Sequence, residues 1–78
     1  MTEKGKDNIV LLQVPEFKQG GVPVEVAAEV FGKSAAWVRD RIVDGKLPIG
    51  TYSSESDMRK NFYISPRLLW EYTGFVYQ

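Results

Sequence analysis

The chain has 78 residues, a formal net charge of zero, and neither cysteine nor histidine. Disulfides, thiolate metal sites and histidine-based catalysis are therefore excluded, and the length suits one domain with a small core. The remaining acids, hydroxyls and lysines form no recognisable catalytic site, so we expect a protein that is not an enzyme and needs no cofactor.

The charge is unevenly distributed along the chain. Residues 1–32 carry a net charge of −2, whereas residues 33–67 carry +3. A local surplus of basic groups is the pattern that phosphate binding requires. No apolar run is long enough for a membrane span, and the N-terminal residues lack the pattern of a signal peptide, so we expect a cytoplasmic protein without a membrane partner.

Residues 1–22 are interpreted as an N-terminal arm that precedes a domain of residues 23–78. Within the arm, residues 9–14 are β-branched and leucine-rich and end at Pro15, which predicts a short strand. A run this apolar must be covered, either by the domain's own sheet or by a second subunit.

The first helix is expected to include Pro23 in its first turn, where the missing N–H of proline is not needed, and to run to about Phe31. Its paired glutamates, Glu25 and Glu29, are interpreted as a solvated face near the helix N-terminus. Helical spacing predicts that a second face packs inward. That face consists of Val24, Ala27, Val30 and Phe31.

The second helix follows a tight turn at residues 32–33 and is expected to be capped by Ser34. Val38 and Ile42 have the i, i+4 spacing of a core pair. A left-handed glycine at position 45 and a proline at position 48 should end the helix, with Leu47 entering the core. The residues expected to point outward are Ala35, Ala36, Arg39, Asp40 and Val43.

Trp37 and Arg41 lie on the flank of this second helix, four residues apart. In one interpretation Trp37 completes the core and the stem of Arg41 covers it. In the other, the two side chains contact DNA directly.

A β-hairpin is predicted from two short runs of β-forming residues, 49–53 and 61–64. The polar segment 54–60 between them is expected to form a long tip that carries Arg59 and Lys60. These two cations would meet phosphates if the hairpin contacts DNA. The alternative is an ordinary solvent-exposed loop.

A closing helix is predicted after Ser65, with Pro66 at its first position and an end at Gly74. Its core-facing residues are expected to be Leu68, Leu69 and Tyr72. The aromatic tail, residues 75–78, either packs back on the domain or docks on a partner.

This order of elements resembles the excisionase-like winged helix-turn-helix domains related to the MerR group. In that family a helix of the form E-x-A-x-x-hydrophobic-G precedes a serine-capped recognition helix ending in G-x-L-P, and a wing leads into a further helix. The corresponding segments here are residues 25–32, 34–42, 45–48 and 62–69, and the resemblance extends from Pro23 to Gly74. It implies a small α+β fold with two helix-turn-helix helices, a hairpin wing and a short C-terminal helix.

The resemblance also implies a function. Such proteins come from phages and mobile elements, bind double-stranded DNA, and act as architectural recombination factors or transcription regulators, with a recombinase or a second copy as partner. Ser34 would contact phosphate, Ala35 and Ala36 would face the groove floor, and Arg39 would contact a phosphate or a base. The expected DNA-binding residues are Lys33, Ser34, Ala35, Ala36, Arg39, Arg41, Arg59 and Lys60.

A second hypothesis is a protein-interaction module on the same scaffold, because a fold does not determine a function. The zero net charge, the acidic residues Asp40 and Asp44 on the second helix and the apolar arm favour this alternative.

Overall fold

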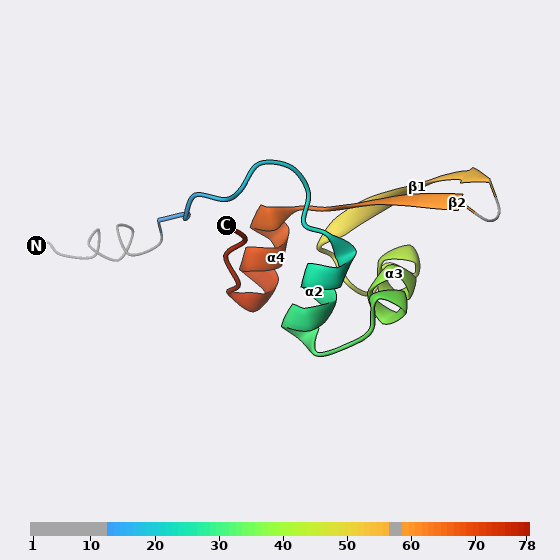
Figure 1. Ribbon diagram of the computed structural model, residues 1–78, viewed down its shortest axis with the longest axis horizontal. Coiled ribbons are helices and arrows are strands. Elements are labelled where there is room, and N and C mark those ends of the chain that lie inside the picture. The colour runs from blue at the N-terminus through green and yellow to red at the C-terminus, as the bar shows by residue number, and fades with distance from the viewer. Residues whose placement is uncertain (1–12, 57–58) are drawn as a thin grey trace, which may run out of the picture.

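The computed structural model describes residues 13–56 and 59–78, which form three helices and one two-stranded antiparallel hairpin (Figure 1). The order is α2 (Val24–Phe31), α3 (Ala35–Val43), β1 (Gly50–Ser56), β2 (Arg59–Ile64) and α4 (Pro66–Thr73). This part of the chain is therefore a small α+β structure, as predicted. None of its helices is long and apolar enough to cross a membrane.

The predicted strand at residues 9–14 falls largely on residues 9–12, which lie outside the described residues. Gln13 and Val14 have no regular secondary structure, and the Val14 side chain is exposed. The described part of the arm therefore adds no strand to the hairpin.

Serine caps and left-handed glycines set the helix ends, as the sequence predicts. The hydroxyl of Ser34 accepts a hydrogen bond from the amide three residues further on, at 3.1 Å, and Ser65 does the same at 3.2 Å. Gly32 and Gly74 follow α2 and α4 with φ angles of +69° and +83°, a region that favours glycine. Pro23 takes the N-cap position of α2, one residue before the predicted place.

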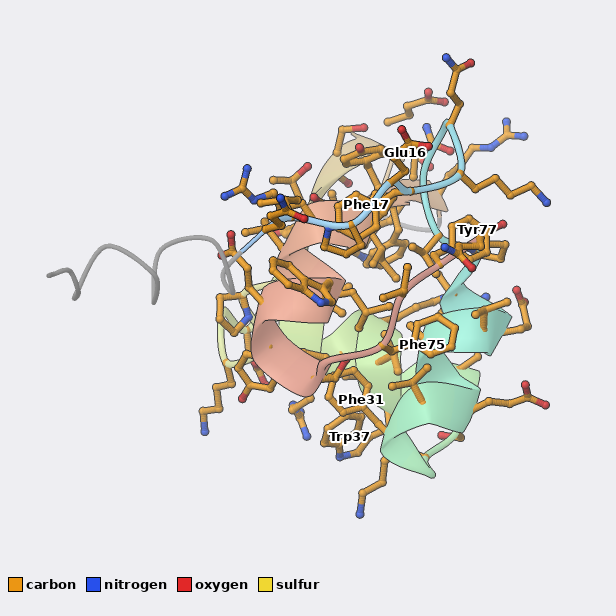
Figure 2. All side chains as sticks on the ribbon, turned by 90° about the vertical axis from the view of Figure 1, so that its left-hand side faces the viewer. Glu16, Phe17, Phe31, Trp37, Phe75 and Tyr77 are labelled. Atoms are coloured by element: carbon orange, nitrogen blue, oxygen red, sulfur yellow. The ribbon has the colours of Figure 1, made fainter. Side chains whose placement is uncertain are left out.

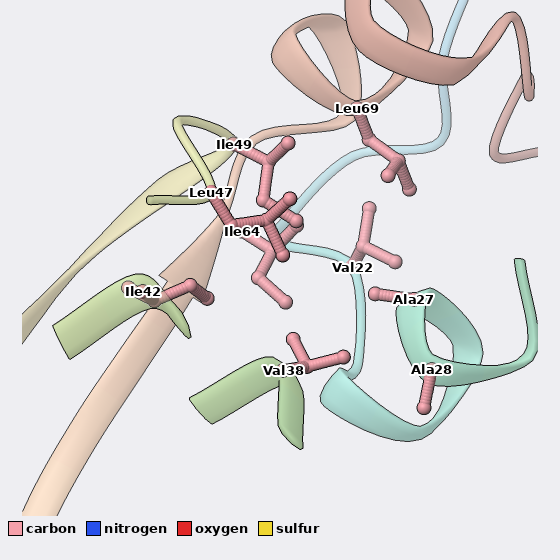
Figure 3. Packing of buried hydrophobic residues seen from close by; sticks show 9 residues of the cluster. All are labelled: Val22, Ala27, Ala28, Val38, Ile42, Leu47, Ile49, Ile64 and Leu69. Atoms are coloured by element: carbon pink, nitrogen blue, oxygen red, sulfur yellow. The ribbon is translucent and has the colours of Figure 1, made fainter. Parts of the chain in front are cut away.

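The core lies between the three helices and the base of the hairpin (Figure 3). Every helix, the hairpin base and the end of the arm contribute to it. Its nine buried side chains are Val22, Ala27, Ala28, Val38, Ile42, Leu47, Ile49, Ile64 and Leu69. The predictions for Val38, Ile42 and Leu47 are confirmed. With so few buried residues, each one contributes a large share of the stability.

The hairpin is longer than predicted and projects beyond the helices (Figure 1). Cross-strand pairing continues through Ser54 opposite Lys60 and Ser56 opposite Arg59, with an irregularity between the two serines. The prediction that residues 54–60 form a long tip is therefore wrong. These strand ends are exposed on both faces, so their pairing requires none of the apolar residues that mark a strand in sequence.

The prediction for the buried face of α4 is correct for only one residue. Leu69 is fully buried, whereas the side chains of Leu68 and Tyr72 are 40% and 53% exposed. Pro66, three residues before Leu69, is the other buried residue of this helix. Tyr72 is three residues after Leu69, yet it lies at the edge of the core, where its ring meets Phe31 at a centroid distance of 6.0 Å. Trp70 is half-buried and packs on Phe17 instead.

The C-terminal tail packs back on the domain, which decides between the two alternatives for it. The Lys18 amide donates to the Tyr77 carbonyl at 2.9 Å, and Phe75 and Tyr77 pack against the core. Figure 2 shows these tail residues lying over the helices. The arm is held as well, because the Val22 amide donates to the Ile64 carbonyl at 2.9 Å.

Candidate functional site

The outer face of α3 is the side opposite its buried residues Val38 and Ile42. Asp40 lies opposite this buried line and is exposed, with Ala36 and Val43 exposed on the same side. One of the predicted outward residues, Ala35, is instead half-buried. Its position three residues before Val38 brings it close to the buried line.

An open hollow with a volume of about 600 Å³ lies between α3 and β2, and we call it the α3–hairpin hollow. It brings together three cations predicted as site residues, two from α3 and one from β2. The hollow is lined by Arg39, Asp40, Arg41, Val43, Asp44, Lys60 and Phe62. Its lining is mixed in charge, with three cations and two carboxylates.

The alternation of side chains along β2 separates its two predicted cations. Successive side chains of a strand point to opposite faces, so Lys60 shares a face with Phe62 and Arg59 lies on the other. The ring of Phe62 stacks on Tyr52 of β1, with ring centroids 5.9 Å apart. Of the two cations, only Lys60 lines the hollow, although both side chains are exposed.

Arg39 connects α3 with the beginning of α2. Its Nη2 atom lies 3.7 Å from Oε2 of Glu25, and the two side chains are 43% and 74% exposed. Ion pairs this exposed contribute only about 0–1 kcal/mol to stability. The contact therefore orients the guanidinium at the edge of the hollow without holding it there strongly.

Trp37 is half-buried and packs on Phe31 at a centroid distance of 6.0 Å (Figure 2). Lys33 and Arg41 both lie over the tryptophan ring. Lys33 Nζ is 5.5 Å from the centre of the tryptophan ring, and Arg41 Cζ is 6.0 Å from it. These contacts agree with the interpretation that Trp37 completes the packing and Arg41 covers it. Lys33 does not line the hollow.

The two aspartates of the hollow differ in their partners. Asp44 accepts hydrogen bonds from Arg41 Nε at 2.8 Å and from the Lys46 amide at 3.0 Å, and it thereby fixes the C-terminal end of α3. Among residues 13–56 and 59–78, the carboxylate of Asp40 has no hydrogen-bond or ion-pair partner. Asp40 is therefore available to a ligand, whereas Asp44 has a structural role.

Four lining residues of the hollow are missing from the predicted site: Asp40, Val43, Asp44 and Phe62. Asp40 and Val43 belong to the set predicted to point outward, so the helical period does predict their exposure on α3. The two-residue period of β2 relates Phe62 to Lys60 in the same way. Of the other predicted residues, Ser34 caps α3 and Ala36 is exposed near its start.

The described residues contain no group of three or more histidine, cysteine, aspartate or glutamate side chains that could hold a metal ion.

No protein-family model matches the chain, and neither a curated protein nor a solved structure matches it.

Proposed function

We propose that the chain binds double-stranded DNA as a winged helix-turn-helix domain, with α3 in the major groove and the hairpin as the wing. The observation that carries this proposal is the α3–hairpin hollow, where Arg39, Arg41 and Lys60 come together in a chain of zero net charge. Clustered cations on a helix and an adjacent hairpin suit the two phosphate backbones that border a groove.

The shape of α3 supports the same proposal. A helix with side chains is about 10–12 Å in diameter, and the major groove is about 12 Å wide. Ala36 near the beginning of the helix has a side chain small enough for close approach to the groove floor. The hairpin extends beyond the helices, so it can reach phosphates that α3 does not (Figure 1).

The face of α3 offers few side chains that can bind base edges, namely Arg39, Asp40 and Val43. One copy therefore makes few specific contacts, and we propose that several copies, or a recombinase bound nearby, contribute the remaining affinity. This is the behaviour expected of an excisionase-like architectural factor or of a MerR-like transcription regulator from a phage or mobile element.

A titration of the protein with a random-sequence fluorescent duplex tests this function directly. We expect binding at about 50 mM salt and a steep loss of affinity towards about 200 mM, because roughly four to seven phosphates would be neutralised. The absence of binding at the lower salt concentration would contradict the proposal. The unpartnered Asp40 would then favour the protein-interaction module.

Two adjacent residues of β2 provide a matched pair of variants for the same titration. Lys60→Ala should weaken binding about two- to fivefold and reduce the salt slope by about one, because one phosphate contact is removed. Arg59→Ala removes the same charge from the opposite face of the hairpin and should have a smaller effect on both quantities. Equal losses from the two variants would show that the hollow side of the hairpin has no special role.

A further inference from the structure

Asp40 occupies an unexpected place for an acidic residue if α3 enters DNA. It lies at the middle of the outer face, is exposed, and has no side-chain partner among the described residues. The nearby cations have other contacts, since Arg39 lies beside Glu25 and Arg41 donates to Asp44. A carboxylate in this place would approach the DNA without a counter-ion of its own.

A carboxylate inside the major groove is unfavourable unless a base supplies a hydrogen-bond donor. Phosphates repel it, and burial without a partner adds a desolvation penalty. Cytosine presents its N4 amino group in the major groove as a donor. Adenine presents an amino donor too, but its N7 acceptor lies directly beside it and repels a carboxylate. Cytosine is therefore the base that best satisfies an unpaired aspartate.

We propose that Asp40 is a specificity-determining residue that accepts a hydrogen bond from the N4 amino group of a cytosine and excludes DNA sites without one. This inference rests on the proposed DNA binding. Repulsion between the Asp40 carboxylate and the phosphates lowers the affinity for DNA in general. The hydrogen bond from cytosine restores the affinity only at sites with cytosine in the matching position. Discrimination between DNA sites therefore comes from repulsion as well as attraction. The neighbouring Val43 provides an apolar surface beside it, suited to a thymine methyl group.

The test is a selection of bound sequences from a duplex pool with randomised central positions, carried out with the wild type and with Asp40→Asn. The wild type should select cytosine at one position and bind it on the order of tenfold more tightly than the other bases there. Asp40→Asn should replace this preference with one for adenine, because an asparagine amide pairs with adenine N6 and N7. It should also bind the unselected pool about twofold more tightly at low salt, since a like charge near the phosphates is lost.

Glu71→Gln is the matched control, because it also neutralises an exposed helical carboxylate, but one that is paired with Arg67 on α4 and lies outside the hollow. It should leave the selected base unchanged. Circular dichroism and the melting temperature confirm that both variants are folded, which the exposure of Asp40 leads us to expect.

The outcomes separate the inference from the function on which it rests. If the wild type binds and selects sequences but Asp40→Asn selects the same base with the same discrimination, the role of Asp40 is overturned and DNA binding is retained. If the wild type binds no duplex in the pool, the proposed function and this inference are both overturned. A change from cytosine to adenine that Glu71→Gln does not reproduce supports the inference.

Discussion

Replacing Leu69 by alanine is expected to lower the free energy of unfolding by about 2–5 kcal/mol, the largest effect on stability that we predict. Leu69 is fully buried and is the residue through which α4 reaches the core, together with Pro66 (Figure 3). A domain of this size has a total stability of only about 4–12 kcal/mol. Urea denaturation followed by circular dichroism should therefore show a much lower midpoint, or no folded baseline.

The adjacent residue is a precise control for this prediction. Leu68→Ala removes the same atoms from the same helix, but its side chain is 40% exposed. Its effect should stay within about 0.5 kcal/mol, as for surface substitutions in general. Equal destabilisation by the two variants would mean that α4 is docked differently from the arrangement described above.

Replacing Arg39 by alanine is expected to weaken DNA binding by about 1–3 kcal/mol, the largest single effect on affinity that we predict. Arg39 lines the hollow on α3, and its guanidinium is kept at the surface beside Glu25. If it contacts a phosphate, the salt slope should also fall by about one. If it contacts a base, affinity for a selected site should fall more than affinity for random duplex.

Arg67→Ala is the matched control for Arg39→Ala. Arg67 is also an exposed helical arginine paired with a glutamate, with its Nε 2.8 Å from Glu71 Oε2. It lies on α4 and does not line the hollow, so its loss should leave DNA affinity nearly unchanged. Similar losses in both variants would indicate a general effect of charge and would remove Arg39 from the site.

The helix ends could be predicted because their signals are local. A serine hydroxyl caps an amide three residues away, and a glycine takes a left-handed φ wherever the chain must leave a helix. Ser34, Ser65, Gly32 and Gly74 therefore have the roles that the sequence predicts. The core pair Val38 and Ile42 could also be predicted from the sequence, because its burial follows from the helical period alone.

Features that depend on residues distant in the sequence could not be predicted from local signals. Which side of α4 faces the core depends on where the chain places that helix, so Leu68 and Leu69 could not be told apart by hydrophobicity. The cross-strand pairing of the hairpin, which extends the strands to Ser56 and Arg59, depends on contacts between exposed polar residues that carry no apolar strand signal. The contact between Arg39 and Glu25 joins two helices, and the sequence contains no signal for it.

The most direct test of the central claim, that α3 and the hollow side of the hairpin form one DNA-binding surface, is an NMR titration. The ¹⁵N-labelled protein is titrated with a short duplex at low salt, and amide shift changes are mapped on the chain. We expect the largest changes in α3 and β2, centred on Arg39, Asp40 and Lys60, with little change along the exposed side of α4 that carries Leu68. Changes centred on α4, or none in α3 and β2 while the duplex binds, would contradict the claim.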